Sequence, residues 1–379
     1  TYIYMKFNVS SKILCNFASS VAKVINDKNA LTILNNFYME LKDDILTLRG
    51  SNTENSLTAH IPVNEAQGEG AVCIDASSLV NMLKQIPDQG ITVEVANSLN
   101  TTIEYSSGRF EFVALDGAGY PRLDTDATAA EGIQFLCTGN ELRKGVDYTL
   151  FATSNDDYRQ QMMGIYFDAK PNSLTFVATD TRKLVKYTTT ECAPGAAASF
   201  IMPPKAAAIV RGLFADDENV KVKVTEKYAV FESESYIFQI QFIQGQYPDI
   251  SRVIPRNNTL QLTIDRQTML NAVRRVSVFV DPAHGLLKFH ITPDYIDMKT
   301  EDTTAMNCAR DRVPCSFTGD TMTIGFSATF LVEILSTITT DDVVISLSDP
   351  GRPGIFCPSE NPEGTDLVML LMPMTISNF

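Results

Sequence analysis

The sequence predicts an α+β protein made of three copies of one domain, each with two helices packed on antiparallel sheets. Residues 201–250 give a Pro-led amphipathic run, an acidic turn, alternating strands and a closing proline. The same order of parts precedes Pro121 and Pro373, and these prolines lie 127 residues before and 125 residues after Pro248. This period is far longer than a solenoid repeat and matches a small domain. We therefore expect domains at 5–124, 131–250 and 256–379.

Helical periodicity accounts for two segments in each copy. The predicted helices are 10–25, 75–86, 140–153, 203–214, 265–280 and 327–338. In the first of them, Ile13, Leu14, Phe17, Val21 and Val24 follow the spacing of a buried stripe. Asp75 and Asp265 stand at N-cap positions, and Pro203-Pro204 opens the central helix. Each copy thus begins one of its helices with a recognisable start signal.

Alternating apolar and polar residues predict the strands. They fall at 6–9, 34–41, 45–61, 91–95, 101–105, 108–115, 135–139, 162–169, 174–189, 220–224, 236–243, 260–264, 285–292, 295–311, 343–347 and 366–373. Alternation means that such strands bury one face and leave the other in water. Segments 121–132 and 248–259 carry Pro and short polar residues without apolar period, as linkers do.

Length and composition limit the class of protein. A chain of 379 residues with 44% hydrophobic and 20% charged residues is ordinary for a globular protein, and no apolar run reaches the ~18 residues of a membrane span. Seven cysteines without a C-x-x-C pair favour a reducing compartment, so we expect a cytoplasmic protein. Residues 1–4 precede Met5-Lys6-Phe7 and are interpreted as an appendage.

Catalytic motifs are missing from the sequence. The three histidines have no metal-binding spacing, and no nucleotide-binding glycine motif or serine nucleophile motif occurs. The aspartate pairs at 43–44, 156–157, 216–217 and 341–342 are the strongest candidates for a two-metal site, which leaves a metal-dependent nuclease as an alternative. Two of these pairs recur between helix and strand, where aspartate favours a turn. We expect no catalytic residue, metal or cofactor.

Basic residues gather on the predicted helices, although the chain has a net charge of −14. That net charge alone argues against a nucleic-acid partner, but the distribution of charge matters more than its sum. The helical set is Lys12, Lys23, Lys84, Arg143, Lys144, Lys205, Arg211, Arg266, Arg274 and Arg275, against Glu141, Asp147 and Glu333. No aromatic ladder accompanies it, so sequence-independent contact with duplex phosphates fits better than base stacking.

The last predicted strand ends in an apolar stretch. Leu370 and Met372 are expected to be core residues of that strand. Because Pro373 interrupts regular strand pairing, Met374 and Ile376 are expected to line a surface groove. Methionine suits an adaptable binding surface.

Several strings resemble the bacterial DNA polymerase III β subunit, the replicative sliding-clamp family. They are Met5-Lys6-Phe7, Phe176-Val177-Ala178-Thr179-Asp180 with Arg182-Lys183-Leu184, Gln246-Tyr247-Pro248-Asp249 with Arg252-Val253-Ile254-Pro255, and Met372-Pro373-Met374. Together with the repeat they cover the whole chain. The resemblance implies a head-to-tail homodimer, a closed ring of six similar domains whose helices line a hole for duplex DNA. It further implies a non-catalytic processivity factor that tethers the polymerase and is opened by an ATP-driven loader.

The resemblance also implies a groove between the second and third domains for partner peptides containing Gln and Leu or Phe. Carried over by position, the groove comprises Met162, Thr179, Lys183, Leu184, Pro248, Arg252, Val253, Leu370, Met372, Pro373 and Met374. The family often has Gly-His where this chain has Thr181-Arg182, and the chain lacks the common basic residue after Met374. These departures put the chemistry of the groove's rim in question.

The family pattern places two further surfaces. A subunit interface would join Arg109, Phe110 and Phe112 of domain one to the part of domain three with Phe279, Val280, Glu301 and Asp302. Lys28 would lie in a loop that touches DNA, although a solvated loop lysine is an equal interpretation. A monomeric scaffold that binds peptides but no DNA remains a second alternative.

Overall fold

The computed structural model describes residues 3–26, 29, 31–121, 131–281, 285–302 and 307–376, with backbone only for Ile3 and Asp302. These residues pack as two compact units. The first comprises Thr1–Leu142 with Lys205–Phe242, and the second Arg143–Pro204 with Ile243–Phe379. The α+β prediction is confirmed, since antiparallel sheets carry the packed helices in both units.

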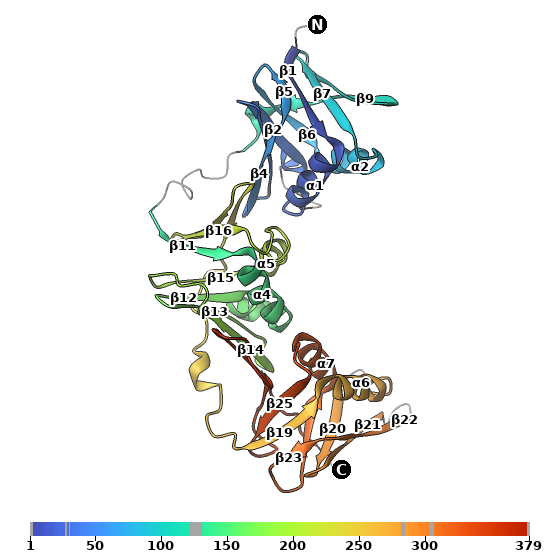
Figure 1. The fold of residues 1–379 in the computed structure, drawn as a ribbon, viewed down its shortest axis with the longest axis vertical. Coiled ribbons are helices and arrows are strands. Elements are labelled where there is room, and N and C mark those ends of the chain that lie inside the picture. The colour runs from blue at the N-terminus through green and yellow to red at the C-terminus, as the bar shows by residue number, and fades with distance from the viewer. Residues whose placement is uncertain are drawn as a thin grey trace. The chain divides into compact units, whose positions relative to one another are not determined.

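The first unit contains two sheets (Figure 1). The five-stranded sheet has the order β5-β1-β7-β8-β9, with bounds Asn64–Gln67, Ile3–Ser10, Gly90–Ala96, Asn100–Tyr105 and Gly108–Val113. The nine-stranded sheet runs β10-β6-β2-β3-β4-β18-β17-β16-β11, with bounds Leu115–Asp116, Gly70–Asp75, Asn36–Lys42, Ile45–Ser51, Ser56–Pro62, Tyr236–Gln241, Tyr228–Glu232, Asn219–Val224 and Ile133–Thr138.

The second unit repeats this design. Its nine-stranded sheet has the order β15-β12-β13-β14-β27-β26-β25-β19-β23, with bounds Ala198–Met202, Ile165–Lys170, Ser173–Thr179, Lys183–Thr189, Thr365–Leu371, Gly354–Pro358, Asp342–Leu347, Leu260–Asp265 and Ser316–Phe317. The four-stranded sheet runs β22-β21-β20-β24, with bounds Asn307–Pro314, Tyr295–Asp302, Leu286–Ile291 and Met322–Ser327.

Each nine-stranded sheet crosses from one sequence repeat into the next. In the first unit β4 pairs with β18, with Ala59 opposite Tyr236. In the second unit β14 pairs with β27 along its whole length, from Lys183 opposite Leu371 to Thr189 opposite Thr365. Strand pairing therefore joins the repeats, and the boundary between the compact units falls inside the central repeat.

The helices match the predicted segments and are shorter. They are α1 (Ser11–Ala22), α2 (Ala76–Gln85), α4 (Gly139–Thr149), α5 (Pro204–Val210), α6 (Arg266–Ser277) and α7 (Ala328–Thr337). The short 3-10 helices are η1 (Thr32–Asn35), η2 (Gly117–Gly119), η3 (Leu150–Ala152), η4 (Asp157–Met162) and η5 (Ile250–Arg252). The predicted caps are confirmed, because Asp75 accepts from the Ser78 amide and Asp265 from the Thr268 amide.

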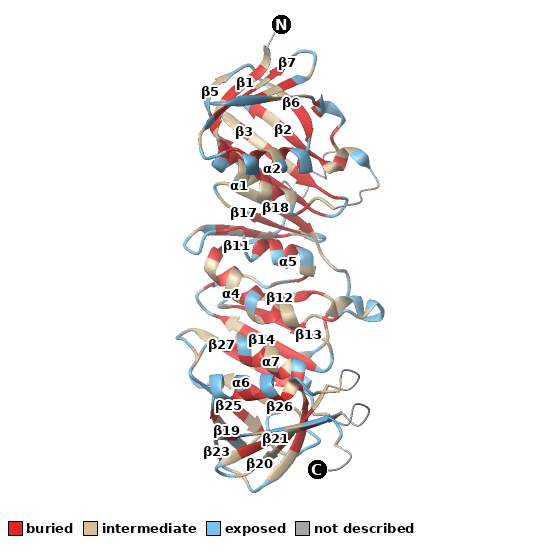
Figure 2. Cartoon of the chain, turned by 90° about the vertical axis from the view of Figure 1, so that its right-hand side faces the viewer, coloured by how far each residue is buried: buried red, intermediate tan, exposed pale blue. Residues whose placement is uncertain are grey.

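Burial follows the predicted pattern with two corrections (Figure 2). Leu14, Val21 and Val24 are buried as expected, but Ile13 is 47% exposed and Ala18 is buried in its place. Ile13 thus lies at the solvent margin of the helix. Residue Tyr4 is no appendage, since it belongs to β1 and its hydroxyl accepts from the Ala71 amide. Its ring occupies the space that a Cβ on Gly70 would fill.

Candidate functional site

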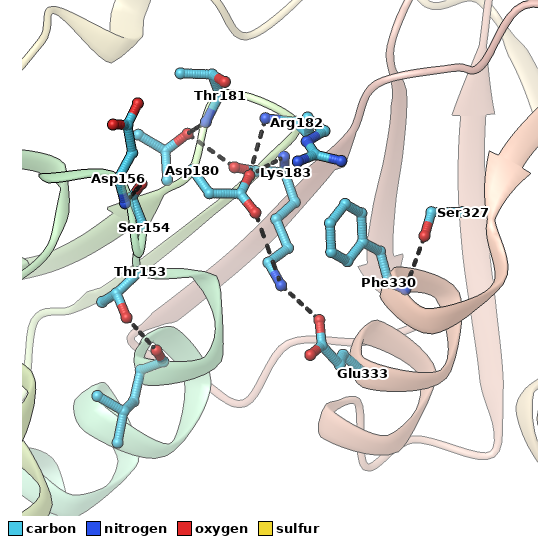
Figure 3. Close-up of polar contacts among 12 residues, drawn as sticks. Thr153, Ser154, Asp156, Asp180, Thr181, Arg182, Lys183, Ser327, Phe330 and Glu333 are labelled. Atoms are coloured by element: carbon cyan, nitrogen blue, oxygen red, sulfur yellow. Dashed lines mark hydrogen bonds and ion pairs between the residues drawn. The ribbon is translucent and has the colours of Figure 1, made fainter. Parts of the chain in front are cut away.

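A tight turn between β13 and β14 forms the centre of the candidate site (Figure 3). The Asp180 carboxylate accepts from the amides of Arg182 and Lys183, at 2.9 and 2.8 Å. The Thr179 hydroxyl donates to the Lys183 carbonyl at 2.8 Å. Thr181 has φ +77°, a left-handed conformation that costs a β-branched residue energy and glycine none. Side-chain hydrogen bonds therefore hold a strained turn.

Lys183 points from this turn into the protein, where its side chain is 5% exposed. Its ammonium lies 2.5 Å from the Glu333 carboxylate of α7 and 3.9 Å from that of Asp180. It also lies over the rings of Phe330 and Phe151, at 4.2 and 5.3 Å from their centroids. Because a buried charge is costly unless it is paired, these contacts compensate the burial of Lys183. They fix the turn against α7.

The chain after β27 runs along this turn to β24. The Met372 amide donates to the Arg182 carbonyl, and the Met374 amide to the Gly325 carbonyl, each at 2.8 Å. The close approach needs glycine, since a Cβ at Gly325 would lie 2.9 Å from the Met374 carbonyl oxygen. Met372 is 37% exposed, whereas Met374 is half-buried. The expectation for these residues is thus corrected, because Met372 is the more exposed and Met374 forms a strand bridge.

A second segment, 245–253, is packed against the same region. Tyr247 is buried and stacks on Tyr166 with ring centroids 4.8 Å apart, and burial raises the pKa of its hydroxyl. Asp249 caps η5 by accepting from the amide and hydroxyl of Ser251, and these bonds lower the pKa of its carboxyl. Arg252 pairs with Asp249 at 3.1 Å, and Val253 is 47% exposed.

The predicted groove residues fall into two groups. Met162, Pro248, Arg252, Val253, Met372, Pro373 and Met374 keep exposed surface, whereas Thr179, Lys183, Leu184 and Leu370 are buried. Hydrogen bonds connect the turn to the C-terminal segment, and a Cβ added at Gly245 would lie 3.5 Å from the Cβ of Gln161 in η4. The buried group supports this surface from beneath. This corrects the expectation that Lys183 lines the groove, because its ammonium is buried and paired with Glu333.

Sequence reasoning missed the contribution of α7. Phe330 and Glu333 are three residues apart, so they project from one face of the helix toward Lys183. Ser327 caps α7 by accepting from the Phe330 amide, which sets where the helix begins. The signal available was Glu333 itself, an acidic residue in a largely apolar helix.

The predicted basic residues are distributed unevenly. Lys12, Lys23, Lys84, Lys205, Arg211, Arg274 and Arg275 are exposed, and Arg143 and Lys144 are half-buried. Lys23, Lys205 and Arg211 line one hollow of about 900 Å³ beside α5. Three of these residues are not free charges. Arg266 donates to the carbonyls of Leu335 and Thr340. Arg275 pairs with Asp311 at 2.7 Å, and Arg143 with Asp147 at 3.9 Å. Lys28 lies outside the described residues.

The predicted interface residues of the first domain lie on a sheet edge. β9, with Arg109, Phe110 and Phe112, is the edge strand of its sheet. Phe279 is 43% exposed just after α6, next to the half-buried Val280.

Two of the predicted interface charges are paired within the chain. Arg109 pairs with Glu111 at 2.9 Å. Glu301 pairs with Lys299 and Lys288, and the hydrogen bond from Lys299 is the main cause that lowers the pKa of Glu301. The side chain of Asp302 lies outside the described residues.

Most of the paired aspartates occupy turns and caps, whereas Asp342 begins β25. Asp43 and Asp44 have φ of 50° and 60° in the turn between β2 and β3. Asp156 caps η4 and pairs with Arg159 at 3.7 Å. Within the described part of the chain, His, Cys, Asp and Glu side chains form no group of three or more that could hold a metal ion. None of the described helices is long and apolar enough to cross a membrane.

Three family models match successive parts of the chain. They are the N-terminal domain of the DNA polymerase III beta subunit at residues 5–124, its central domain at 137–249 and its C-terminal domain at 251–375. The chain belongs to the DNA polymerase III beta subunit family. The three matches follow the three repeats of the sequence.

Relatives in the beta subunit family span nearly the whole chain. A beta sliding clamp of Treponema pallidum is 25% identical over 96% of this chain and 99% of its own length. A beta sliding clamp of Haemophilus influenzae is 23% identical over 98% of this chain and 100% of its own length.

Solved beta subunits share the fold. A sliding clamp from Pseudomonas aeruginosa bound to griselimycin has a TM-score of 0.91 at 22% identity, with 98% of this chain and 100% of that chain covered. The beta subunit of Thermotoga maritima gives 0.90 at 20% identity, with the same coverage.

Proposed function

We propose that this chain is a DNA sliding clamp, a processivity factor that encircles duplex DNA and tethers a replicative polymerase. The observation that carries this proposal is the charge of its helices within an acidic protein. Among the described residues of the six α-helices, Asp147 is the one exposed acid and it pairs with Arg143 at 3.9 Å, while Glu141 is buried and Glu333 is paired with Lys183. A basic helical surface attracts phosphates without reading sequence.

Ring closure would use the open sheet edges. β9 ends one sheet of the first unit, and β22 ends the four-stranded sheet of the second. An exposed edge strand invites pairing with another chain, and a head-to-tail dimer would cover both edges at once. Val113 is 69% exposed on β9, which supplies apolar area for such a contact. We propose that Phe279 and Val280 flank it.

Partner peptides would bind along the surface formed by Met372, Pro373, Pro248 and Val253, which we name the C-terminal groove. Its apolar side chains are partly exposed, while the turn beneath them is held by hydrogen bonds. An apolar surface with a rigid floor is suited to bind a short extended segment at low entropic cost. The polymerase and the loader are the partners that we propose for it.

In this proposal the chain performs no catalysis and works in the cytoplasm. Ring opening would be driven by a loader that hydrolyses ATP. The aspartates that suggested a nuclease serve turns, caps and ion pairs. Incubation with labelled DNA and Mg²⁺ or Mn²⁺ tests this point. Cleavage that is lost in Asp156→Ala would contradict the proposal.

Topological retention tests the clamp itself. The protein is placed on nicked circular duplex DNA by a bacterial clamp loader with ATP, and the DNA is then separated from free protein by gel filtration. We expect the protein to stay with the circle and to leave after a restriction enzyme linearises it. Equal retention on linear DNA would refute encirclement. Sedimentation of the free protein at micromolar concentration should give a dimer, and a monomer would count against the ring.

A further inference from the structure

Arg182 lies at the rim of the C-terminal groove, and its backbone is fixed on both sides. Its amide donates to Asp180 at 2.9 Å, and its carbonyl accepts from Met372 at 2.8 Å. Its guanidinium lies 5.8 Å from the centre of the Phe330 ring. The side chain is exposed, yet it begins from a position that is set directly beside Met372. Such a residue can contact a bound segment with little loss of backbone entropy.

The guanidinium of Arg182 has no carboxylate within ion-pairing distance among the residues that the structure describes. Two acids in contact with the neighbouring residue Lys183 are engaged by its ammonium. Asp180 and Glu333 both face the ammonium of Lys183, at 3.9 and 2.5 Å. The buried lysine therefore engages the carboxylates of both residues.

The other arginines around the groove differ in this respect. Arg252 pairs with Asp249 at 3.1 Å, and Arg159 pairs with Asp156 at 3.7 Å. Both pairs join residues three positions apart within one short segment. Arg182 is thus the groove arginine that remains available to an incoming anion.

We propose that Arg182 selects partner segments that carry an aspartate or glutamate beside their apolar anchor. This inference rests on the proposed peptide-binding function of the C-terminal groove. The apolar anchor would sit on Met372 and Val253, and the carboxylate would accept two N–H bonds from the planar guanidinium. A paired guanidinium–carboxylate contact is directional, which makes it a source of specificity.

Lysine would serve less well at this position. Its ammonium is a compact point charge without the fork of donors, and it is more strongly hydrated. The guanidinium also lies over the Phe330 ring, at 5.8 Å from its centroid, which adds a cation–π contact. The rim thus combines charge with a defined direction.

Two peptides test the proposal by fluorescence anisotropy. The probes are a labelled Gly-Gln-Ala-Asp-Leu-Phe-Gly and its twin with Asn in place of Asp, both blocked at their termini. We expect the wild-type protein to bind the Asp peptide roughly 3- to 10-fold more tightly at low salt, the range of a partly exposed charged pair. Arg182→Gln should abolish that preference, and Arg182→Glu should reverse it.

Arg252→Gln is the matched control, since Arg252 is also exposed near the groove but has an internal partner. It should keep the preference for the Asp peptide. A preference that survives in Arg182→Gln, or one that the wild type never shows, would overturn the role of Arg182. If neither peptide binds the wild type at all, the groove itself is refuted, which separates that failure from the failure of Arg182.

Discussion

Replacing Glu333 with glutamine removes the main partner of a buried cation. Lys183 is 5% exposed, and without Glu333 its nearest carboxylate is Asp180 at 3.9 Å. Breaking a fully buried pair costs about 3–5 kcal/mol. Glu333 is itself 34% exposed, so solvent screening reduces the expected loss of unfolding free energy to about 2 kcal/mol.

Urea denaturation followed by circular dichroism measures this loss. The unfolding midpoint of Glu333→Gln should fall while the slope with urea stays unchanged. The exposed Glu363→Gln is the control and should stay within about 0.5 kcal/mol of wild type. The double variant Lys183→Met with Glu333→Gln should recover much of the loss, because no charge is left buried. A Glu333→Gln variant as stable as the control would refute the account of the turn.

Three further predictions concern the turn, an ion cluster and the groove. Thr181→Gly should raise the free energy of unfolding by about 0.5–1 kcal/mol, because glycine adopts φ +77° without strain, whereas Thr181→Ala should not stabilise the protein in urea melts. Hydrogen bonds from Arg312 and Arg310 hold the pKa of the Asp297 carboxyl below its ordinary value. The stability that ionised Asp297 adds to the fold is therefore present above about pH 4 and is lost as pH falls through the lower, folded pKa. Asp297→Asn should therefore make the stability of the protein less dependent on pH in the acid range, and an unchanged acid limb would contradict this. Met372→Ala with Met374→Ala should weaken the Asp peptide several-fold in anisotropy without unfolding the protein; unchanged affinity would exclude the groove.

Local pattern was enough to predict the helices and their caps. Asp75 and Asp265 cap their helices as the sequence indicated, because a cap depends on residues within one turn. The pairing of β14 with β27 could not be read in this way, since alternation tells which face is buried but not which strand lies alongside.

The site was harder to predict because its charges are compensated by distant residues. Lys183 and Glu333 are 150 positions apart in the sequence, and no local pattern links them. Arg266 likewise looked like a free helical cation, yet it donates to carbonyls of α7 and of the loop after it. The family resemblance could name candidate residues by position, but the depth at which each side chain lies depends on packing.

The pairing of β27 with β14 has a consequence for how the protein is made. Because β14 is translated long before β27, one edge of β14 stays unpaired until β27 has left the ribosome. The segment with Met372 can reach the turn only after that strand has docked. A nascent or truncated chain would therefore lack the C-terminal groove, so partners that need the groove would engage only finished molecules.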